Sequence, residues 1–410
     1  MSERKIKVLL ISYACEPNKG SEPGIGWNWA VHLSKLADVV VVTRKNNKQN
    51  IKKELYKKNY DNLSFIYFDI PIISKIKKIL PFGIQLYYLL WEYNVIKKLK
   101  NYSEFDLFLR LTFGSTVTLL KFHKLNKPYI LSFCAGGEIS PITIYAKYSF
   151  FEKAKEKIRL YYNSLYKYSA LVKRIYMGSR LILAVTHDTK RFIESFGVKN
   201  KIIVEPAIGL NEYVIKDHYE KQYKIIYAGS LIYWKNVDII IKAIGSLSSD
   251  KIYLDIYGSG GKEKRLIKYV IKNKITNRIH FNGNLLRDEL LKKYKEYDLA
   301  IHASSHDSGS MFLLEAISNG LPVLFLDTGG PKERFRNIDY PLKVNPELSY
   351  EEIIESFKYK IEWFYQNYDI FINNFLEIRQ KIIERFSWEN KAKRMIEIYK
   401  EILNENPSSS

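Results

Sequence analysis

Short apolar runs alternate with amphipathic stretches along most of the chain. The first run, KIKVLLISYA at residues 5–14, leads into a turn containing glycine and an expected helix from about Gly26 to Leu36. Apolar runs of this length between helical segments are typical of βαβ units, so the pattern predicts a parallel sheet covered by helices. The other strands expected in this half are DVVVVTR and LSFIYFDI, with a basic helix near Lys48 to Lys58 between them.

The same alternation starts again in the second half of the chain. The expected strands are YKIIYAGSL, IYLDIYGSG, RIHFNGN, DLAIHAS and LPVLFLD, separated by helices near 237–247, 262–272, 287–297 and 311–319. We therefore predict an α/β protein with two doubly wound, Rossmann-like domains and parallel sheets. The second pattern has not yet begun at EPAIGLNEY, which places an N-terminal domain at 1–208 and a C-terminal domain at 209–386.

A final helix is expected at 387–404, with Ser387 as its N-cap. Its apolar residues recur at helical spacing, so this helix has one apolar face. We expect that face to pack back onto the N-terminal domain. The residues concerned are Trp388, Ala392, Met395, Ile396, Tyr399 and Leu403.

The charge of the chain points to an anionic partner. Lys and Arg number 65 against 44 Asp and Glu, a formal charge of +21, although Lys, Ile, Asn and Tyr are abundant throughout. No helix-turn-helix, zinc-finger or RNP-type motif is recognisable, so no nucleic-acid partner is expected. Two isolated cysteines, Cys15 and Cys134, and a first apolar run too short for a signal peptide favour a cytoplasmic protein.

Two segments suggest peripheral contact with an anionic inner membrane. No clean run of 18 apolar residues occurs, but lysine clusters flank the apolar, aromatic centre of 74–100, and 147–174 has a similar mixture. In the first segment one face of an expected helix is apolar, and such a helix could lie in the membrane interface. The alternative is that both faces pack inside the N-terminal domain. The stripe in question is Ile84, Tyr87, Tyr88, Trp91 and Val95.

The stretch HDSGSMFLLEAISNG places Asp307 and Glu315 on either side of seven small and apolar residues. Asp307 follows an expected strand, and Glu315 lies near the start of the next expected helix. The first amides of a helix have no partners inside it and attract anions. Lys235, after the first strand of the second half, lies where a lysine can neutralise a phosphate. Together these residues predict a site for a ligand with phosphates and hydroxyls. The alternative is a solvated loop, an ordinary helix and a surface lysine.

Glycine loops and metal motifs add little by themselves. In GSEPGIGW, Gly24 and Gly26 suit a tight turn and close backbone approach, but Trp29 takes the third position of a dinucleotide fingerprint. GSGGKE at Gly258 fails the same test, and no P-loop occurs. The chain has no Asp-any-Asp triplet and no His/Cys cluster with zinc spacing. His280 and His302 fall in expected strands, so we expect no bound metal and no cofactor.

These motifs resemble the family-four retaining glycosyltransferases, whose GT-B fold has two facing Rossmann-like domains. Asp307 and Glu315 match the family's two carboxylates, which have seven residues between them, with Asp in place of the first Glu. AGSLIYWKN supplies the family's lysine as Lys235, although Ser230 replaces its arginine. SYACEPNKGSEPGIGWNWA is similar to a bacterial subgroup of surface polysaccharide assembly, in which Arg110 would stand in for a histidine.

The resemblance implies transfer of a sugar from a nucleotide-diphosphate donor to a glycan or lipid-linked acceptor, with retained anomeric configuration and no metal. Lys235 and the amides near Ser310 would stabilise the leaving diphosphate. Glu315 would bind the ribose, and Asp307 the hydroxyls of the donor sugar. Other expected donor-side residues are Gly229, Ser230, Gly258, Asn284, Ser308, Gly309 and Met311, and the acceptor or phosphate side is assigned to Gly24, Gly26, Arg110 and Glu138.

Two other functions fit the same sequence. A nucleotide-sugar epimerase of this fold would form its product without an acceptor. A catalytically inactive, membrane-associated binding protein would fit the replacements at Ser230, Arg110 and Asp307.

Overall fold

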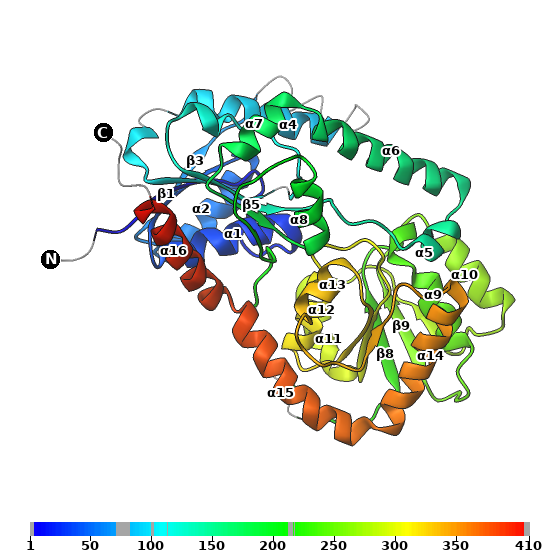
Figure 1. Ribbon diagram of the computed structural model, residues 1–410. Coiled ribbons are helices and arrows are strands. Elements are labelled where there is room, and N and C mark those ends of the chain that lie inside the picture. Colours follow the sequence, from blue (N-terminus) through cyan, green and yellow to red (C-terminus); the bar gives the residue numbers. More distant parts are fainter. Residues whose placement is uncertain are drawn as a thin grey trace. The chain divides into compact units, whose positions relative to one another are not determined.

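The computed structural model describes residues 4–70, 83–99, 102–112, 114–211, 216 and 218–405. The chain forms two compact units (Figure 1). Unit 1 comprises Met1–Gly137, Leu160–Gly209 and Ser387–Ser410, and unit 2 comprises Glu138–Arg159 and Leu210–Phe386.

The expected N-terminal domain, 1–208, is therefore interrupted, because Glu138–Arg159 group with unit 2. Polar contacts explain this assignment. Tyr148 Oη and Ser305 Oγ share a hydrogen bond of 2.8 Å, and Glu152 is ion-paired with Lys262. Sequence pattern alone did not reveal that an insertion after the fifth strand of one unit packs on the other.

Unit 1 is built on a parallel sheet of seven strands in the order β3-β2-β1-β4-β5-β6-β7. The direction of winding reverses between β1 and β4, so the carboxyl ends of these two neighbours form the switch point of the sheet. The strands are β1 (Lys7–Ile11), β2 (Asp38–Thr43), β3 (Leu63–Tyr67), β4 (Leu107–Arg110), β5 (Tyr129–Cys134), β6 (Leu181–Ala184) and β7 (Ile202–Val204).

Helices flank this sheet: α1 (Ser21–Ser34), α2 (Lys48–Lys57), α4 (Gly83–Val95), α7 (Ala170–Met177), α8 (His187–Glu194) and α16 (Trp388–Asn404). α1 begins five residues before the expected start. Gly24 and Gly26 therefore lie inside its first two turns. A Cβ on Gly26 would lie 2.1 Å from the carbonyl oxygen of Ala14, so the glycine lets the helix approach the loop after β1.

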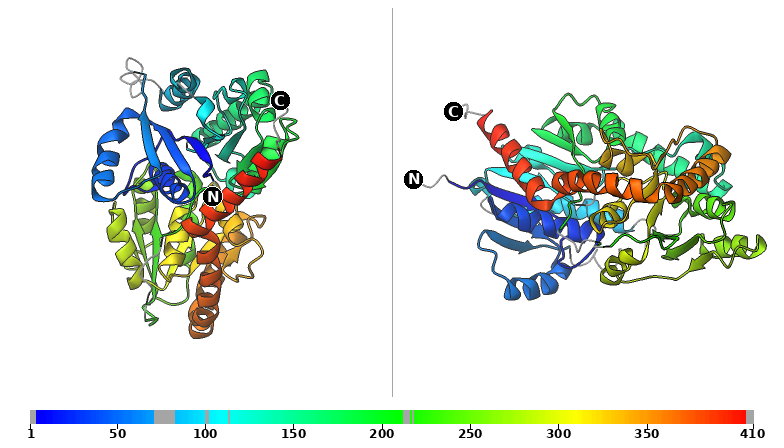
Figure 2. Two further views of the ribbon diagram at one scale, coloured as in Figure 1. Left: turned by 90° about the vertical axis from the view of Figure 1, so that its left-hand side faces the viewer. Right: turned by 90° about the horizontal axis from the view of Figure 1, so that it is seen from below.

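The C-terminal helix α16 belongs to unit 1 and packs against α1, as Figures 1 and 2 show. The Trp29 and Trp388 rings meet edge to face at 5.4 Å, a favourable aromatic geometry. Lys391, which is fully buried, is paired with Glu205 and donates to the Pro206 carbonyl oxygen at 2.7 Å. Ser387 caps the helix by accepting from the amide of Asn390.

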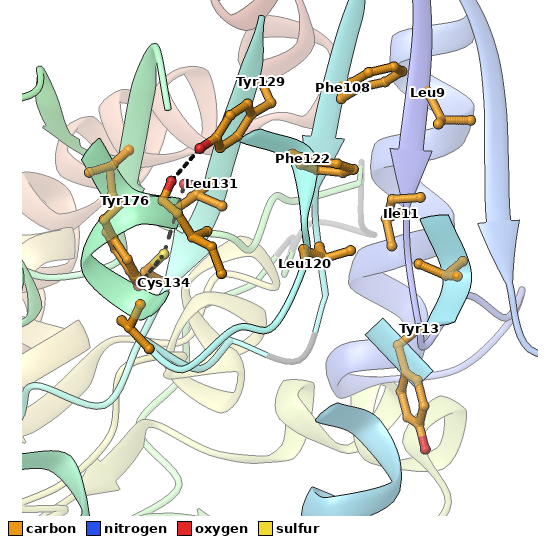
Figure 3. Close-up of a cluster of buried hydrophobic side chains, with 14 of the residues drawn as sticks. Leu9, Ile11, Tyr13, Phe108, Leu120, Phe122, Tyr129, Leu131, Cys134 and Tyr176 are labelled. Atoms are coloured by element: carbon orange, nitrogen blue, oxygen red, sulfur yellow. Dashed lines mark hydrogen bonds between the residues drawn. The ribbon is translucent and has the colours of Figure 1, made fainter. Parts of the chain in front are cut away.

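One buried cluster fills the face of the sheet covered by α4, α7 and α8 (Figure 3). Tyr87, Trp91 and Val95 are completely buried there, and Tyr88 is 2% exposed. The apolar stripe expected to lie in a membrane interface is thus core, apart from the exposed Ile84, and the prediction of an interfacial α4 is wrong. The flanking segment 71–82, with its lysines, lies outside the described residues.

Unit 2 has a parallel sheet of six strands in the order β10-β9-β8-β11-β12-β13, with its switch point between β8 and β11. The strands are β8 (Lys224–Ala228), β9 (Tyr253–Tyr257), β10 (Ile279–Phe281), β11 (Leu299–His302), β12 (Val323–Leu326) and β13 (Lys343–Val344). The two parallel, doubly wound sheets confirm the predicted α/β fold class.

The helices of unit 2 cover both faces of its sheet (Figure 1). α9 (Val237–Gly245), α10 (Glu263–Lys272) and α14 (Tyr350–Gln366) lie on one side, and α11 (Arg287–Lys293), α12 (Met311–Ser318) and α13 (Gly329–Arg334) on the other. α15 (Tyr368–Phe386) packs on α12 and α14. α5 (Ile142–Ala146) also belongs to unit 2, and α6 (Phe150–Lys167) starts in unit 2 and ends in unit 1.

Among the described residues, no helix combines the length and apolar character needed to cross a membrane.

Candidate functional site

The switch point of unit 2 brings a cation and a carboxylate together. Lys235 ends the short 3-10 helix η5 (Tyr233–Lys235) after β8, and Asp307 follows β11, the neighbour of β8. Lys235 Nζ donates to Asp307 Oδ2 at 2.5 Å. The two side chains keep 18% and 14% exposure, so this ion pair is sheltered but still accessible. The two residues that the sequence had placed at one sheet edge are thus in direct contact.

Asp307 also organises the loop in front of α12. Its Oδ1 accepts from the amides of Gly309 at 3.0 Å and Ser310 at 2.7 Å. His302 Nε2 lies 3.3 Å from Asp307 Oδ2, and both ring nitrogens otherwise lack a partner among the described residues. Burial alone would raise the pKa of Asp307, but Lys235 and His302 outweigh burial and hold that pKa well below its usual value. Asp307 is therefore a carboxylate at neutral pH.

The N-terminus of α12 opens beside this carboxylate. Ser310, the residue before the helix, has a left-handed backbone with φ of +46°, and its side chain makes no capping bond. Its buried Oγ has no partner among the described residues. Arg334 donates to the Gly309 carbonyl oxygen, and a Cβ on Gly330 would lie 2.8 Å from Ser310 Oγ. The loop of 307–310 is therefore held tightly while its helix end retains capacity for an anion.

Glu315 lies one turn further along α12, buried except for 7% of its side chain. Its Oε1 accepts from Arg287 Nε at 2.7 Å, and Oε2 has no hydrogen bond to the described residues. Burial raises the pKa of Glu315, and the nearby Arg287 guanidinium opposes the rise. A buried carboxylate with one oxygen available is suited to accepting from paired hydroxyls.

The three strand ends next to Lys235 also meet. The amide of Gly229, after β8, donates to the Tyr257 carbonyl oxygen at 2.9 Å, and the amide of Gly258 donates to the Gly283 carbonyl oxygen at 2.7 Å. A Cβ on Gly258 would lie 2.0 Å from the Gly229 oxygen, so glycine is required at this crossing, where φ is +133°. At this part of the carboxyl edge of the sheet, the surface therefore consists of glycine backbone and not of side chains.

Four further donor-side residues lie on the same edge of unit 2. Asn284, after β10, shares hydrogen bonds with the Ser259 side chain. Ser230 is exposed beside Gly229, Ser308 is half-buried in the loop after Asp307, and Met311 is the first residue of α12. The structure thus collects the predicted donor-side residues at the carboxyl edge of a single sheet.

The residues predicted for the acceptor side do not form one group. Arg110 ends β4 but is 1% exposed, with Nε 2.8 Å from Glu92 Oε1 and Nη1 donating to the Ser115 carbonyl oxygen at 2.9 Å. Its guanidinium is therefore engaged inside unit 1 and not directed toward a ligand, which corrects the expected role. Gly26 serves close packing of α1, as described above, and a Cβ on Gly24 would lie 2.0 Å from the carbonyl oxygen of Lys19.

Glu138 belongs to unit 2, not to the N-terminal half in which its sequence position had placed it. It is 2% exposed, and its carbonyl oxygen accepts from Arg159 Nη2 at 2.9 Å. Gly329 lies beside its side chain: an added Cβ there would be 3.6 Å from Glu138 Cγ. Glu138 thus lies near the start of α13 and the 307–310 loop.

Sequence reasoning missed three residues of the site: His302, Arg287 and Arg334. His302 had been assigned to strand core or rim, although its place at the carboxyl end of a buried strand was a signal. Arg287 of α11 bonds to Glu315, 28 positions away in the sequence, and Arg334 of α13 bonds to Gly309, 25 positions away. No local pattern connects them to Glu315 or Gly309.

The arrangement combines a cation, a helix N-terminus and two carboxylates at the switch point of a doubly wound sheet. This is the usual position of a nucleotide-type ligand in such folds, and the residue types suit phosphates and hydroxyls. The described residues contain no group of three or more His, Cys, Asp or Glu side chains arranged to hold a metal ion. The fold is a two-unit α/β architecture of the GT-B type, and this edge of unit 2 is the candidate ligand site.

Comparison with known proteins gives a family match for the C-terminal half of the chain. Residues 212–395 match the model described as glycosyl transferases group 1. The UDP-N-acetylglucosamine–peptide N-acetylglucosaminyltransferase GtfA subunit of Streptococcus agalactiae is 28% identical over 155 residues, which are 36% of this chain and 30% of that protein. The O-antigen biosynthesis glycosyltransferase WbnH of Escherichia coli is 27% identical over 143 residues, covering 35% and 40%. The matches thus span less than half the length of these relatives.

The fold comparison extends over the whole chain. A sucrose-phosphate synthase from Thermosynechococcus elongatus has a TM-score of 0.68 at 16% identity, covering 98% of this chain and 100% of that one. Residues 212–395, somewhat less than half of the chain, thus match the group-1 glycosyltransferases, and the whole chain has the two-domain GT-B fold.

Proposed function

We propose that the protein is a retaining glycosyltransferase that moves a sugar from a nucleotide-diphosphate sugar to a glycan or lipid-linked acceptor in bacterial surface polysaccharide synthesis. The observation that carries this proposal is the Lys235–Asp307 pair at the open N-terminus of α12. The match of residues 212–395 to the model described as glycosyl transferases group 1 and the names of the relatives described above support it.

The reaction breaks the bond between the anomeric carbon and the β-phosphate oxygen while the acceptor oxygen bonds to the same carbon. The acceptor proton passes to the departing phosphate, so the balance needs no other reagent. Negative charge grows on the diphosphate, and stabilising that charge is the main task of such a site. An ammonium has three N–H donors, and Asp307 takes one from Lys235, which leaves donors for a phosphate.

The two carboxylates have different tasks in this proposal. Glu315, with Oε2 available, accepts from the ribose hydroxyls of the nucleotide. Asp307, kept ionised by Lys235 and His302, accepts from hydroxyls of the donor sugar near the reacting carbon. The positive end of the α12 helix dipole supplements Lys235, because Ser230 offers no charge where the family has an arginine. Retention then follows from attack on the face that the diphosphate leaves.

The test is incubation with UDP-, GDP- and dTDP-sugars, beginning with UDP-N-acetylglucosamine because the Streptococcus agalactiae relative is named for it. Release of nucleoside diphosphate is followed with and without a lipid-linked saccharide. Transfer that depends on the acceptor supports the proposal. A changed sugar without an acceptor would indicate an epimerase, and binding without turnover an inactive binding protein. Excess EDTA is expected to leave turnover unchanged, and loss restored by magnesium or manganese would refute metal independence.

Peripheral membrane contact is the second part of the proposal, and the exposed residues of α6 are its support. Exposed apolar residues normally lie apart from one another, but Phe150, Phe151 and Tyr161 are 81%, 76% and 63% exposed on this one helix. Lys155 and Lys157 are exposed among them. Aromatic rings beside lysines suit the interface of an anionic membrane, where a lipid-linked acceptor would be collected. The other exposed members on the helix are Ile158, Tyr162 and Leu165, and the exposed Tyr168 follows directly after it.

Sedimentation with phosphatidylglycerol vesicles tests this contact. We expect wild type to sediment at low salt and less at high salt, since charge attraction is screened. Phe151→Ser with Tyr162→Ser should remain in the supernatant. Tyr359→Ser with Ile370→Ser, which removes two residues exposed by 63% and 70% on α14 and α15, is the matched control. Equal sedimentation of both double variants would show that α6 does not dock.

A further inference from the structure

A cavity distinct from the candidate donor site lies entirely within unit 2. It has a volume of about 220 Å³ and is enclosed by the 144–152 segment, η5, the starts of α9 and α10, and the first residue of α14. None of the residues assigned above to the donor site lines it. The cavity does share one structural element with that site, because Tyr233 of η5 forms part of its wall and Lys235 ends the same element.

The lining of the cavity is predominantly cationic. It contains Lys147, Lys242, Lys262 and Arg265 against the carboxylates Glu152 and Asp238, so four positive and two negative charges leave a formal excess of two positive charges. The Arg265 side chain is exposed and has no hydrogen bond or ion pair to the described residues. An anion of charge about −2 would complement this lining.

Part of that charge is already compensated. Lys262 is paired with Glu152, and Lys242 Nζ lies 3.9 Å from Asp238 Oδ2. Lys147 Nζ pairs at 2.7 Å with Glu351, where both side chains are largely exposed. Exposed pairs of this kind are weak and exchange readily with a ligand. Lys147 and Arg265 are therefore the cations most available to an incoming anion.

Four tyrosines give the cavity a second chemical character. Tyr148 and Tyr233 meet edge to face at 5.0 Å, and Tyr269 and Tyr350 lie on the α10 and α14 side. Asn236, before α9, has a left-handed backbone, and its side chain does not cap the helix. The backbone amides at the N-terminus of α9 can therefore still donate hydrogen bonds to a ligand in the cavity. The hydroxyls of Tyr148, Tyr233 and Tyr350 are hydrogen-bonded within the protein, but the aromatic rings suit the faces of a sugar ring, as in many small-molecule sites that combine apolar walls with a few polar groups.

We propose that this cavity binds a monosaccharide carrying a phosphate monoester, with the phosphate at Arg265, Lys147 and Lys242 and the sugar ring among the tyrosines. Arg265 supplies one positive charge and Lys147 a second when the ligand replaces its exposed partner Glu351, and two positive charges match a phosphate monoester at neutral pH. The volume of about 220 Å³ is smaller than the usual range for drug-sized ligands, which favours a single sugar over a nucleotide.

An occupant of this cavity contacts supports of the candidate donor site. Tyr233 precedes Lys235 by two residues, and Tyr148 shares a hydrogen bond of 2.8 Å with Ser305, two residues before Asp307. The Ser305 amide in turn donates to the Trp234 carbonyl oxygen at 2.9 Å. A bound sugar phosphate would therefore restrict both loops that position the Lys235–Asp307 pair. This site thus goes beyond the proposed function, since it is separate from the donor residues and does not require catalysis.

Calorimetric titration of the full-length chain with glucose 6-phosphate tests the proposal, with glucose and inorganic phosphate as separate arms. We expect one molecule of glucose 6-phosphate to bind, and to bind at least tenfold more tightly than either simpler probe. The variant Arg265→Gln with Lys147→Gln removes two exposed cations and should bind roughly tenfold more weakly or worse. Lys264→Gln with Lys268→Gln removes two exposed charges from the same α10 and should bind as wild type does.

Three results would overturn the proposal: no binding, equal loss in both double variants, or inorganic phosphate binding as tightly as the sugar phosphate. A further titration in saturating UDP separates this site from the donor site. Glucose 6-phosphate should still bind in UDP and to Lys235→Ala. Displacement by UDP would place the sugar phosphate at the donor residues and contradict the cavity assignment, whatever the fate of the proposed function.

Discussion

Each unit has a charged pair at the switch point of its sheet, and the two pairs differ in how far they are exposed to solvent. Arg110 ends β4 and Asp307 follows β11, each beside the strand at which its sheet reverses direction. In unit 1, Arg110 and Glu92 are both 1% exposed. In unit 2, Lys235 and Asp307 keep 18% and 14% of their side-chain surface. One pair is sealed into the fold, whereas the other can still meet a ligand.

The hydrogen bonds explain the difference. Glu92 Oε2 accepts from Thr118 Oγ1 at 2.9 Å and from the Leu119 amide at 3.0 Å, while Oε1 is used by Arg110 and Tyr88. This network is closed, as a buried charge requires. Lys235 instead has a single described acceptor, Asp307. A fully satisfied pair supports structure, and an incompletely satisfied, accessible pair can support binding.

Breaking the sealed pair should have the largest effect. Glu92→Gln keeps the shape of the side chain but leaves the Arg110 guanidinium without its buried counter-charge. We expect unit 1 to lose about 3–5 kcal/mol of unfolding free energy. Hydrogen exchange of β4 and α4 in denaturant measures it, with Lys235→Met as the matched control in the accessible pair. A loss under about 1 kcal/mol for Glu92→Gln would show that the network is dispensable.

Acid should weaken unit 1 through His32. Burial first, and then Lys35, lower the pKa of His32 to about 4, and its ring lies against Trp388. The unfolded chain binds this proton near pH 6.5, so stability is lost as pH falls from about 6.5 toward 4. After allowance for partial exposure, the loss attributable to His32 is roughly 2 kcal/mol.

His32→Gln has no such proton, so its unfolding free energy should change less over this pH range than that of wild type. Denaturant unfolding at pH 7 and pH 4.5 gives the comparison. Parallel pH dependence in the two proteins would exclude His32 as the source.

The smallest effect is expected at Arg287. Burial raises the pKa of Glu315 and Arg287 opposes this, so Arg287→Gln should raise that pKa further. If Glu315 accepts from the ribose as a carboxylate, affinity for UDP is lost as pH falls through its pKa. The variant should lose affinity at a higher pH than wild type, with less than about a threefold change at pH 8. Coincident pH profiles would separate Arg287 from the ionisation of Glu315.

The sequence predicted the repeated βαβ pattern well because buried parallel strands are short apolar runs bounded by turns. It also placed Lys235, Asp307 and Glu315 at one sheet edge, since that edge follows from strand order. It could not predict that the α4 stripe is core, because an apolar helical face looks the same against a membrane or a protein interior. The roles of Arg110, Arg334 and segment 138–159 depend on contacts between distant residues, which no local pattern encodes.

The central claim is that the accessible pair of unit 2, with Glu315, binds a nucleotide-diphosphate sugar. Calorimetric titration with the donor that supports turnover, or with UDP, tests it on Lys235→Ala, Glu315→Gln and the exposed control Lys268→Ala. We predict roughly ten- to a hundredfold weaker binding by the first two variants, because each loses a charged hydrogen bond to the ligand. Binding by the control should be unchanged. Wild-type affinity in both Lys235→Ala and Glu315→Gln, with the fold intact, would contradict the account.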